Sequence, residues 1–224
     1  MKKILISFSG GLDSTTLLAY CLNEGMEVHA VSFSYGSKHN KYENEAAKRI
    51  IEHYEIPFHF FDLTPIFNSF QSSLLQSGGP IPEGHYQAES MRQTVVPARN
   101  MIFISILTGL AESLKIPIIG LGVHAGDHFI YPDCRPGFIR PIRKAIFEAT
   151  DNSVQLFTPF LMLTKKEIID LSWSIVDEIP YHLTRTCYKD QEKACGVCGS
   201  CQERLEAFKL AGIPDPIKYE AKEE

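Results

Sequence analysis

Short runs of apolar, β-branched and aromatic residues alternate along this 224-residue chain with segments whose apolar residues recur at helical spacing. The short runs predict five strands, at Lys3–Ile6, Glu27–Phe33, Pro57–Asp62, Pro117–Gly122 and Val154–Phe157. The helical spacing predicts helices at Thr15–Leu22, Asn44–Tyr54, Met101–Leu114, Thr164–Trp173 and Gln202–Ala211. This alternation predicts an α/β fold, an open, doubly wound, parallel five-stranded sheet built by right-handed crossovers.

Two parts of the chain depart from the alternation. Residues 64–96 show no periodicity and contain Ser-Gly-Gly-Pro-Ile-Pro-Glu-Gly at residues 77–84. Irregular segments of this length are usually lids or binding loops, and we expect a lid here. Cysteine, glycine and polar residues dominate residues 185–201. We therefore divide the chain into an α/β domain at residues 1–180 and a small C-terminal cysteine-rich helical region at residues 181–224.

The segment between the first strand and the first helix reads Ser-Phe-Ser-Gly-Gly-Leu-Asp-Ser-Thr at residues 7–15. A glycine pair lets the backbone turn tightly there, and the free N–H groups of the helix start favour a phosphate. A Walker A loop is excluded because no lysine follows Gly11, and the adjacent glycines do not fit the dinucleotide fingerprint. A hydrolase nucleophile elbow would need a glycine where Ser7 stands.

The segment matches S-G-G-x-D-S at every fixed position and so resembles the pyrophosphate loop of the ATP pyrophosphatase family. The alternative is a Gly-Gly turn in an ordinary strand-helix junction. The resemblance implies that ATP binds at Phe8, Ser9, Gly10, Gly11, Leu12, Asp13, Ser14, Thr15, Thr16, Leu17 and Leu18.

Four cysteines near the C-terminus follow the spacing C-x7-C-x2-C-x2-C, namely Cys187, Cys195, Cys198 and Cys201. Two-residue gaps let neighbouring cysteines converge on one ion, and four thiolates fill the tetrahedral shell of zinc. An iron–sulfur cluster also accepts four cysteines, so the spacing alone leaves the metal open. Zinc is favoured because nucleotide-dependent activation needs no redox centre. A full shell leaves no position for water, which predicts one structural Zn²⁺ per chain.

Four further polar residues are candidates for the chemistry. Arg99 stands at the start of the most apolar predicted helix, where it would hold a triphosphate or a leaving pyrophosphate; a solvated arginine is the alternative. The V-P-x-R-N pattern around it recurs in the ATP pyrophosphatase family, which favours the functional interpretation. Lys165 would contact the phosphates or an acyl-adenylate, with a solvated helix lysine as its alternative. For Lys38 and His39, the sequence likewise leaves open whether the side chain contacts a ligand or is solvated.

Two aspartates follow the fourth predicted strand. Asp127 and Asp133 fall where the carboxyl ends of parallel strands form a ligand crevice. A carboxylate there can accept two N–H bonds from the N1/N2 edge of a guanine-like base. The alternative is that these side chains cap turns, which aspartate does often.

Composition limits the cellular compartment and the partners that we expect for the protein. The formal net charge of −5 offers no broad electrostatic grip on nucleic acid, and 44% hydrophobic with 22% charged residues is typical of a globular protein. The apolar run at the N-terminus ends too early for a signal peptide, and no run approaches the 18 apolar residues of a membrane span. We expect a cytoplasmic protein with reduced cysteines and no membrane or nucleic-acid partner.

In sum, the chain resembles the 7-cyano-7-deazaguanine synthase branch of the ATP pyrophosphatase family, which makes a queuosine precursor. The matching pieces are residues 9–15, 34–36, 38–39, 96–97 with 99–100, 131–135, 186–188 and the four cysteines. Tyr-Pro-Asp-Cys-Arg together with the cysteine set is specific to this branch. Departures occur at Ala98, at Arg185 and at residues 127–130.

The resemblance implies a reaction in two stages. ATP, with Mg²⁺, adenylates the carboxylate of 7-carboxy-7-deazaguanine, and ammonia displaces AMP to give an amide. A second ATP activates the amide oxygen, and loss of AMP gives the nitrile. The residues implied for catalysis are Asp13, Arg99 and Lys165, and those for substrate binding are Asp127, Tyr131, Asp133 and Arg135. Family members form homodimers, which we expect here.

Two other classes of function compete with this one. A tRNA-modifying enzyme with the same loop would be expected to carry a basic face or an RNA-binding domain. A zinc-stabilised nucleotide-binding module would bind ATP and release no AMP.

Overall fold

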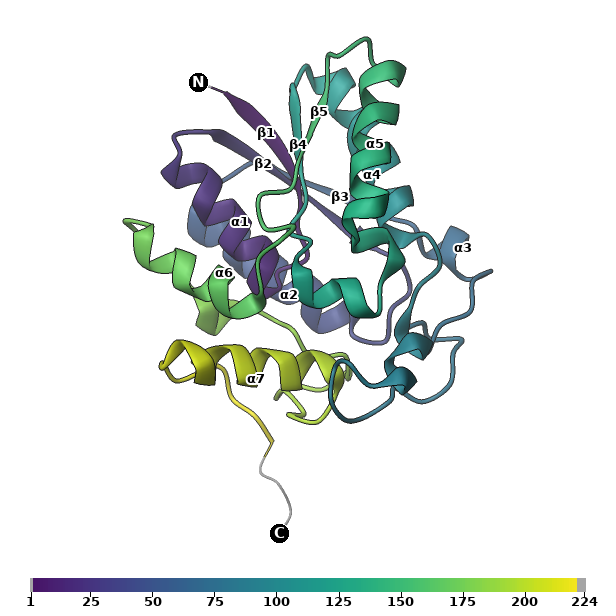
Figure 1. Cartoon of the computed structure of the whole chain (residues 1–224), viewed down its shortest axis with the longest axis vertical. Coiled ribbons are helices and arrows are strands. Elements are labelled where there is room, and N and C mark those ends of the chain that lie inside the picture. The colour runs from purple at the N-terminus through teal and green to yellow at the C-terminus, as the bar shows by residue number, and fades with distance from the viewer. Residues whose placement is uncertain (1, 221–224) are drawn as a thin grey trace.

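A parallel sheet of five strands forms the centre of the computed structural model, which describes residues 2–220. The strands are β1 (Lys3–Ser7), β2 (Glu27–Ser34), β3 (Phe58–Asp62), β4 (Ile118–Gly120) and β5 (Gln155–Phe157). Their order is β3-β2-β1-β4-β5, and every neighbouring pair is parallel (Figure 1). The five predicted strands and the doubly wound α/β fold are confirmed. The order reverses at β1, between β2 and β4.

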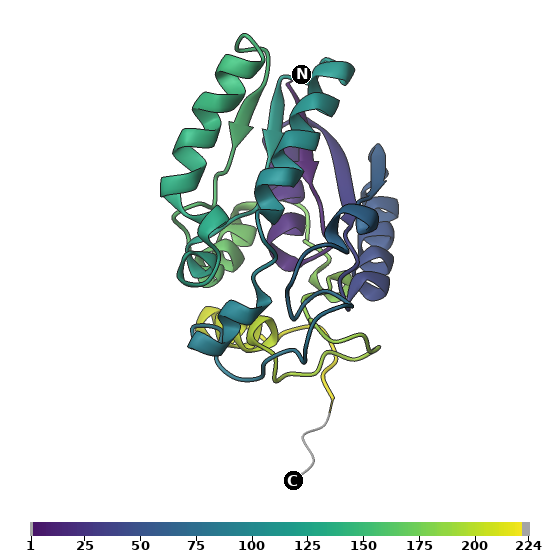
Figure 2. The ribbon, with the colours of Figure 1, turned by 90° about the vertical axis from the view of Figure 1, so that its right-hand side faces the viewer.

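Helices cover both faces of this sheet because its central strands are apolar on both sides. In β1, Ile4 and Ile6 pack with α1 (Leu12–Asn23) and α2 (Asn40–Tyr54), whereas Leu5 packs with the opposite layer. That layer consists of α4 (Arg99–Leu114) and α5 (Pro136–Ala149), which Figure 2 shows in front of the sheet. The three apolar side chains of β1 are fully buried, as expected for a parallel strand covered on both faces.

Helix α4 is buried on one side and exposed on the other. Ile104 and Leu107 lie in the core, but Met101 is 50% exposed and Leu114 is 40% exposed. A sequence that is apolar nearly all round predicts a buried helix at Met101–Leu114, and this prediction is wrong on the outer side of α4. Within residues 2–220, one helical stretch, Glu89–Leu114, has the length and apolar composition of a membrane span, and its α4 part packs on the sheet as a core helix does.

Helix α5 was not predicted. Pro136 and Pro141 read as breaker signals in the sequence, yet a proline in the first helical position is tolerated because its missing N–H has no intrahelical partner anyway. Ile139 and Ile146 bury the inner side of α5 in the core. Packing against the sheet therefore outweighs the low helix propensity of the proline at position 141.

Residues 64–96 run beside the carboxyl ends of the strands. They include the short helix α3 (Thr64–Phe67) and the 3₁₀ helix η1 (Glu89–Thr94). The Gly84 N–H donates to the Val197 carbonyl at 2.9 Å, and Lys189 Nζ donates to Glu83 Oε1 at 2.6 Å. The segment is thus tied to the cysteine-rich region, and its role as a lid stays a prediction.

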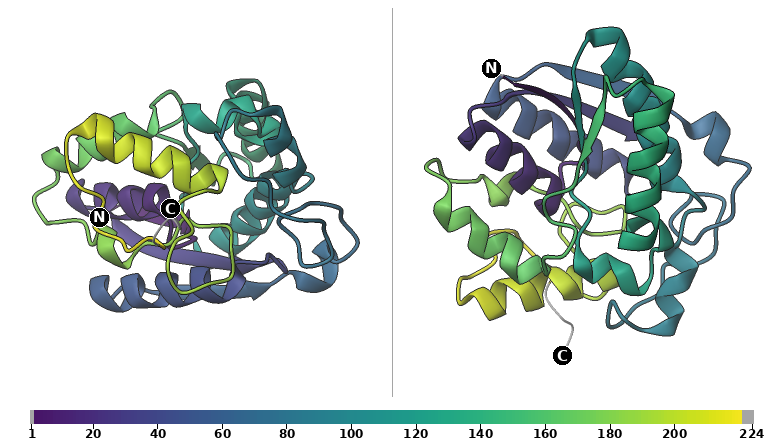
Figure 3. Two further views of the ribbon diagram at one scale, coloured as in Figure 1. Left: turned by 90° about the horizontal axis from the view of Figure 1, so that it is seen from below. Right: turned by 45° about the horizontal axis from the view of Figure 1, so that its top comes forward.

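The C-terminal region ends in α7 (Gly199–Ala211), which packs on α6 (Lys165–Leu171) and lies beyond the carboxyl ends of the strands (Figure 3). Arg204 of α7 is fully buried and donates to both carboxylate oxygens of Asp215, at 2.8 and 2.9 Å. It also donates to the hydroxyls of Thr184 and Thr186. Arg204 therefore joins three separate segments of this region. The remaining 3₁₀ helices are η2 (Ala125–Phe129), η3 (Pro132–Cys134), η4 (Ser172–Ser174) and η5 (Tyr181–Leu183).

Candidate functional site

A cavity of about 240 Å³ opens at the carboxyl ends of β1, β2 and β4, where the strand order reverses. Open parallel sheets bind ligands at this point, because loops on the two sides of the switch diverge and leave a crevice. The cavity is lined by the loop after β1, the start of α4, the segment after β4, and residues of α6 and α7. The predicted site residues therefore converge from elements far apart in the chain.

The loop after β1 is folded tightly on itself. Gly11 N–H donates to Ser9 Oγ at 3.2 Å, and Ser9 N–H donates to Ser14 Oγ at 3.3 Å. Gly10 adopts φ of +75°, and a Cβ there would lie 2.5 Å from the backbone nitrogen of Ala47 in α2. Glycine is therefore required at position 10 both by conformation and by space.

Apart from Gly10, the predicted ATP-binding residues divide into two groups. Those that line the cavity are Phe8, Ser9, Gly11, Leu12, Asp13 and Ser14. Thr15 and Thr16 are fully buried within α1 and donate their hydroxyls to the carbonyls of Gly11 and Leu12. Leu17 and Leu18 lie in the apolar core beneath the loop. Contact of either group with ATP stays a prediction.

Lys165 lies at the floor of the cavity rather than in solvent, with 6% of its side chain exposed. Its Nζ is 2.7 Å from Glu203 Oε2 and 3.3 Å from Asp13 Oδ2. Burial opposes its charge, but Asp13 and Glu203 outweigh burial and raise the pKa of Lys165. Burial likewise opposes the charge on Asp13, but Lys165 and His124 outweigh it and lower the pKa of Asp13. Both partners are therefore charged at neutral pH.

Arg99 lies at the start of α4 among tyrosines. Its guanidinium donates to the Tyr35 hydroxyl at 3.3 Å and lies 5.9 Å from the centre of the Tyr131 ring. Within residues 2–220, no carboxylate oxygen lies within 4.0 Å of its guanidinium nitrogens. Burial raises the pKa of Tyr35 to about 12, so this hydroxyl stays neutral. Arg99 thus presents a positive charge to the cavity.

The four predicted substrate-binding residues are placed differently. Asp127 and Tyr131 line the cavity, and the Tyr131 hydroxyl lies 3.1 Å from that of Tyr188. Asp133 accepts the Asn100 backbone N–H at 2.8 Å, so its carboxylate caps the first turn of α4, a distant contact that neither sequence interpretation included. Arg135 donates to the His128 carbonyl at 2.7 Å and to that of Phe129 at 3.3 Å, which braces the loop containing Asp127.

The two polar residues after β2, Lys38 and His39, have different positions relative to the cavity. Lys38 donates to the carbonyls of Gly78 and Gly79 and so anchors the 64–96 segment. His39 lines the cavity, with Nε2 at 3.4 Å from Glu43 Oε2. Burial lowers the pKa of His39 to about 3 and raises the pKa of Glu43 to about 7. His39 is therefore neutral at physiological pH.

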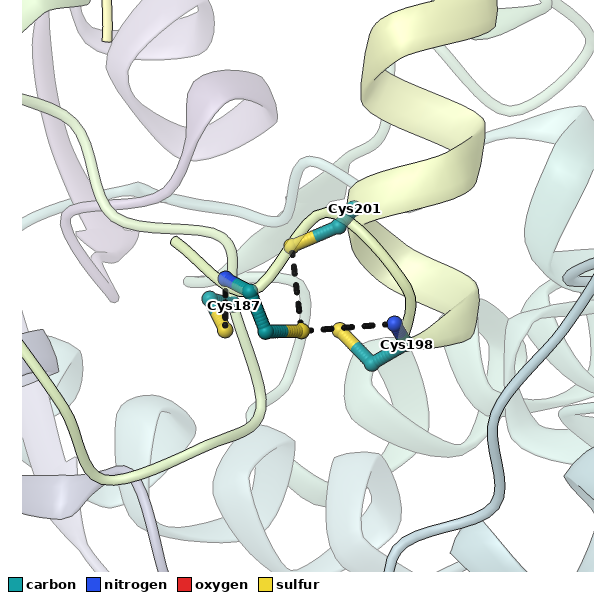
Figure 4. Close-up of side chains that lie close together, drawn as sticks. Cys187, Cys198 and Cys201 are labelled. Atoms are coloured by element: carbon teal, nitrogen blue, oxygen red, sulfur yellow. Dashed lines mark hydrogen bonds between the residues drawn. The ribbon is translucent and has the colours of Figure 1, made fainter. Parts of the chain in front are cut away.

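The four C-terminal cysteines form one buried cluster. Their sulfur atoms lie within 4.8 Å of one another, and Figure 4 shows those of Cys187, Cys198 and Cys201 grouped at the start of α7. Thiolates at about 2.3 Å from one zinc ion would be about 3.8 Å apart, close to the 4.0 Å between the sulfurs of Cys195 and Cys201. Backbone N–H groups donate to the sulfurs of Cys187 and Cys195. The cluster fits a tetrahedral metal such as zinc.

Comparison with known proteins defines the family. Residues 3–212 match the family model described as "Queuosine biosynthesis protein QueC". The chain belongs to this family. A 7-cyano-7-deazaguanine synthase of Caldicellulosiruptor saccharolyticus is 44% identical over 218 residues, which are 97% of this chain and 96% of the relative. A relative of the same name from Pseudoalteromonas translucida is 42% identical, over 98% of this chain and 99% of its own. The resemblance stated from the motifs is confirmed.

The structure adds cavity residues to this QueC-family chain that sequence reasoning did not assign. They are Tyr35, Glu43, Tyr188 and Glu203, and His124 lies behind them with Nε2 at 3.7 Å from Asp13 Oδ2. Tyr35 and Tyr188 lie within segments that carry the family resemblance, so the motif itself was a signal. Glu203 lies two positions after Cys201, in a segment whose cysteine spacing predicted only a metal site. Nothing in the sequence relates Glu203 to Lys165.

Proposed function

We propose that this protein converts 7-carboxy-7-deazaguanine and ammonia to 7-cyano-7-deazaguanine, with ATP as the activating substrate. Family membership over residues 3–212 carries the proposal, because the curated relatives named above are 7-cyano-7-deazaguanine synthases. The cavity supports it physically. It combines a loop without the Walker lysine with two cations, Arg99 and Lys165, which suits attack at the α-phosphorus with pyrophosphate departing.

The first stage forms the amide. A carboxylate oxygen of the substrate attacks the α-phosphorus of ATP, the bond to the bridging oxygen breaks, and pyrophosphate leaves onto the loop that contains Ser9 and Ser14. Arg99 and Lys165 stabilise the charge that develops on the phosphates. Ammonia then attacks the acyl carbon, AMP leaves, and the nitrogen loses a proton. Catalysis rests on positioning and charge stabilisation, with no covalent bond to the enzyme.

The second stage forms the nitrile at the same place. The amide oxygen attacks the α-phosphorus of a second ATP, and pyrophosphate leaves again. The nitrogen loses one of its two protons as the adenylated imidate forms, and loss of AMP from the carbon together with the second N–H proton then produces the C≡N bond. Both stages need the same cavity, because the acceptor oxygen lies on the same carbon of the substrate each time.

Substrate recognition is assigned to the side of the cavity formed after β4. Asp127 is the carboxylate whose position suits the N–H edge of the deazaguanine ring, and Tyr131 lies beside it. Asp133 and Arg135 support this wall through the contacts described above. Asp13 and Asp127 offer carboxylate oxygens on the same cavity, which suits the Mg²⁺ that accompanies ATP.

The cysteine cluster is proposed to hold one structural Zn²⁺, because four sulfur ligands leave no position for substrate or water. We further propose a cytoplasmic homodimer that acts on small molecules and does not use nucleic acid. Residues 64–96 are proposed as a lid because they connect β3 to α4 and contribute Tyr86 and Met91 to the lining of the cavity.

The test is to incubate the protein with MgATP, ammonium chloride and 7-carboxy-7-deazaguanine. The expected result is AMP, pyrophosphate and a product with the mass of the nitrile. Arg99→Met should abolish product, whereas Arg92→Met, at an exposed arginine paired with Glu89, should leave it unchanged. AMP release that depends on added tRNA, or ATP binding without any AMP release, would overturn the proposal.

A further inference from the structure

Glu203 of α7 holds the ammonium of Lys165 from the side opposite the phosphate loop. Its carboxylate is 11% exposed, and Oε2 accepts from Lys165 Nζ at 2.7 Å. The same Nζ lies 3.3 Å from Asp13 Oδ2 in the first turn of α1. The ammonium is thus clamped between a carboxylate beside the phosphate loop and a carboxylate from the cysteine-rich region.

The imidazole of His124 lies beside the two carboxylates that hold Lys165. Gly126 N–H donates to His124 Nδ1 at 3.1 Å, so Nδ1 is an acceptor and Nε2 is the nitrogen that carries a proton. That Nε2 faces Asp13 Oδ2 at 3.7 Å and Glu203 Oε1 at 4.0 Å. A Cβ at position 126 would lie 2.2 Å from Glu203 Oε1, so this carboxylate fills the space that only a glycine leaves. Glu203 therefore occupies a place shaped for it.

Lys165 needs such a partner because of its position in its own helix. It is the first residue of α6, directly after the capping residue Thr164. The positive end of the helix dipole and the unpaired N–H groups there disfavour an ammonium. A lysine side chain is also long and flexible, so without a fixed carboxylate it would sample many positions. Glu203 supplies both the charge and the fixed point.

The position of Glu203 is in turn set by the cysteine cluster. Cys198 precedes the first residue of α7, and Cys201 lies in its first turn. A metal on these two thiolates would fix the start of the helix, and Glu203 follows within the same two turns. Next to it, Arg204 is locked by Asp215. Glu203 therefore lies between two fixed points of the chain, Cys201 before it and Arg204 after it.

We propose that Glu203 is a positioning residue that holds Lys165 at the phosphate loop, so that the metal-binding start of α7 sets the geometry of the nucleotide site. The proposal rests on the proposed function in one respect, namely that Lys165 contacts the phosphates of ATP. It predicts that Glu203 favours nucleotide binding only through Lys165.

A double-mutant cycle tests this. The variants are Glu203→Gln, Lys165→Met and the double variant, and Glu206→Gln, one turn further along α7 with 46% of its side chain exposed, is the matched control. The dissociation constant for MgATP is measured by titration calorimetry without any other substrate. Glu203→Gln alone should weaken binding about tenfold, a coupling typical of side chains in direct contact. Glu206→Gln should have no effect.

The decisive result is the sign of the effect in the Lys165→Met background. With the ammonium gone, the Glu203 carboxylate only repels the phosphates, so Glu203→Gln should leave binding unchanged or make it tighter. An equal loss in both backgrounds would show that Glu203 acts on the fold in general and would overturn the proposal. Metal content and the melting temperature of each variant are measured alongside, and Glu203→Gln should keep wild-type metal content.

If the Glu203→Gln variant does not fold, a variant with a shorter acidic side chain takes its place. Glu203→Asp keeps the charge but withdraws it by one methylene, so a smaller loss of MgATP affinity is expected, and no loss would contradict the proposal. Product formation is assayed separately. Coupled binding effects without the nitrile product would overturn the proposed function alone, and product formation with equal losses in both backgrounds would overturn this inference alone.

Discussion

Replacement of Gly10 by alanine should destabilise the protein far more than the same change at Gly25. Both glycines have a positive φ, +75° and +70° respectively. They differ in surroundings, because a Cβ at position 10 would lie 2.5 Å from Ala47 N and 2.9 Å from Ala47 Cα, whereas nothing lies within 4 Å of a Cβ at position 25. Gly25 therefore isolates the cost of backbone conformation from the cost of crowding.

The magnitudes follow from these two terms. An alanine in the left-handed region costs about 1–2 kcal/mol, and this term applies to both variants. The neighbour at position 10 is the backbone of α2, which cannot rotate away as a side chain can. Overpacking of this kind costs about 1–3 kcal/mol more. We expect a loss of about 2–5 kcal/mol for Gly10→Ala and about 1–2 kcal/mol for Gly25→Ala.

Equilibrium unfolding in urea, followed by circular dichroism, measures both variants against the wild type. The slope with urea concentration should be unchanged, so that the shift in midpoint reports stability. Equal losses for the two variants would refute the close packing of the phosphate loop on α2. Gly10→Ala should also weaken MgATP binding, because relief of the clash moves the loop away from α2.

Three further perturbations have outcomes fixed by the structure. Asp215→Asn leaves Arg204 buried without its partner and should lower the free energy of unfolding by about 3–5 kcal/mol, measured in urea; a loss below about 1 kcal/mol would contradict the buried ion pair. Burial raises the pKa of Glu43 from 4.5 to about 7, so the folded protein keeps a proton that the unfolded chain releases, and stability is lost as pH rises through this window. Glu43→Gln should remove this loss and gain about 3 kcal/mol over the wild type at pH 8, and an equal pH dependence of both proteins would refute the burial of Glu43. Cys198→Ser should reduce bound metal from one per chain to none and cost at least about 3 kcal/mol, measured by elemental analysis and calorimetry; wild-type protein without metal would contradict the cluster's role.

The strands and most helices were predictable because each carries its own periodic signal. Ile4 and Ile6 mark β1 as a buried strand, and the Thr164 capping box marks the start of α6, where the structure has both of its hydrogen bonds. Helix α5 was missed because Pro136 and Pro141 hide a helix that packing against the sheet sustains. The exposed side of α4 was missed because an apolar sequence does not say which side meets the sheet.

The sequence alone determined the chemistry of contiguous motifs. Adjacent glycines in the loop that contains Asp13, and two-residue gaps between cysteines, are constraints on neighbouring atoms, so they can be read along the chain. Tertiary structure alone decided which side chains meet across the cavity. Glu203 reaches Lys165, and Asp133 caps α4 instead of facing the cavity, because helices from distant segments pack at angles that no local pattern records. The charge on Lys165 is sustained by partners that only the packing of α6 against α1 and α7 brings within reach.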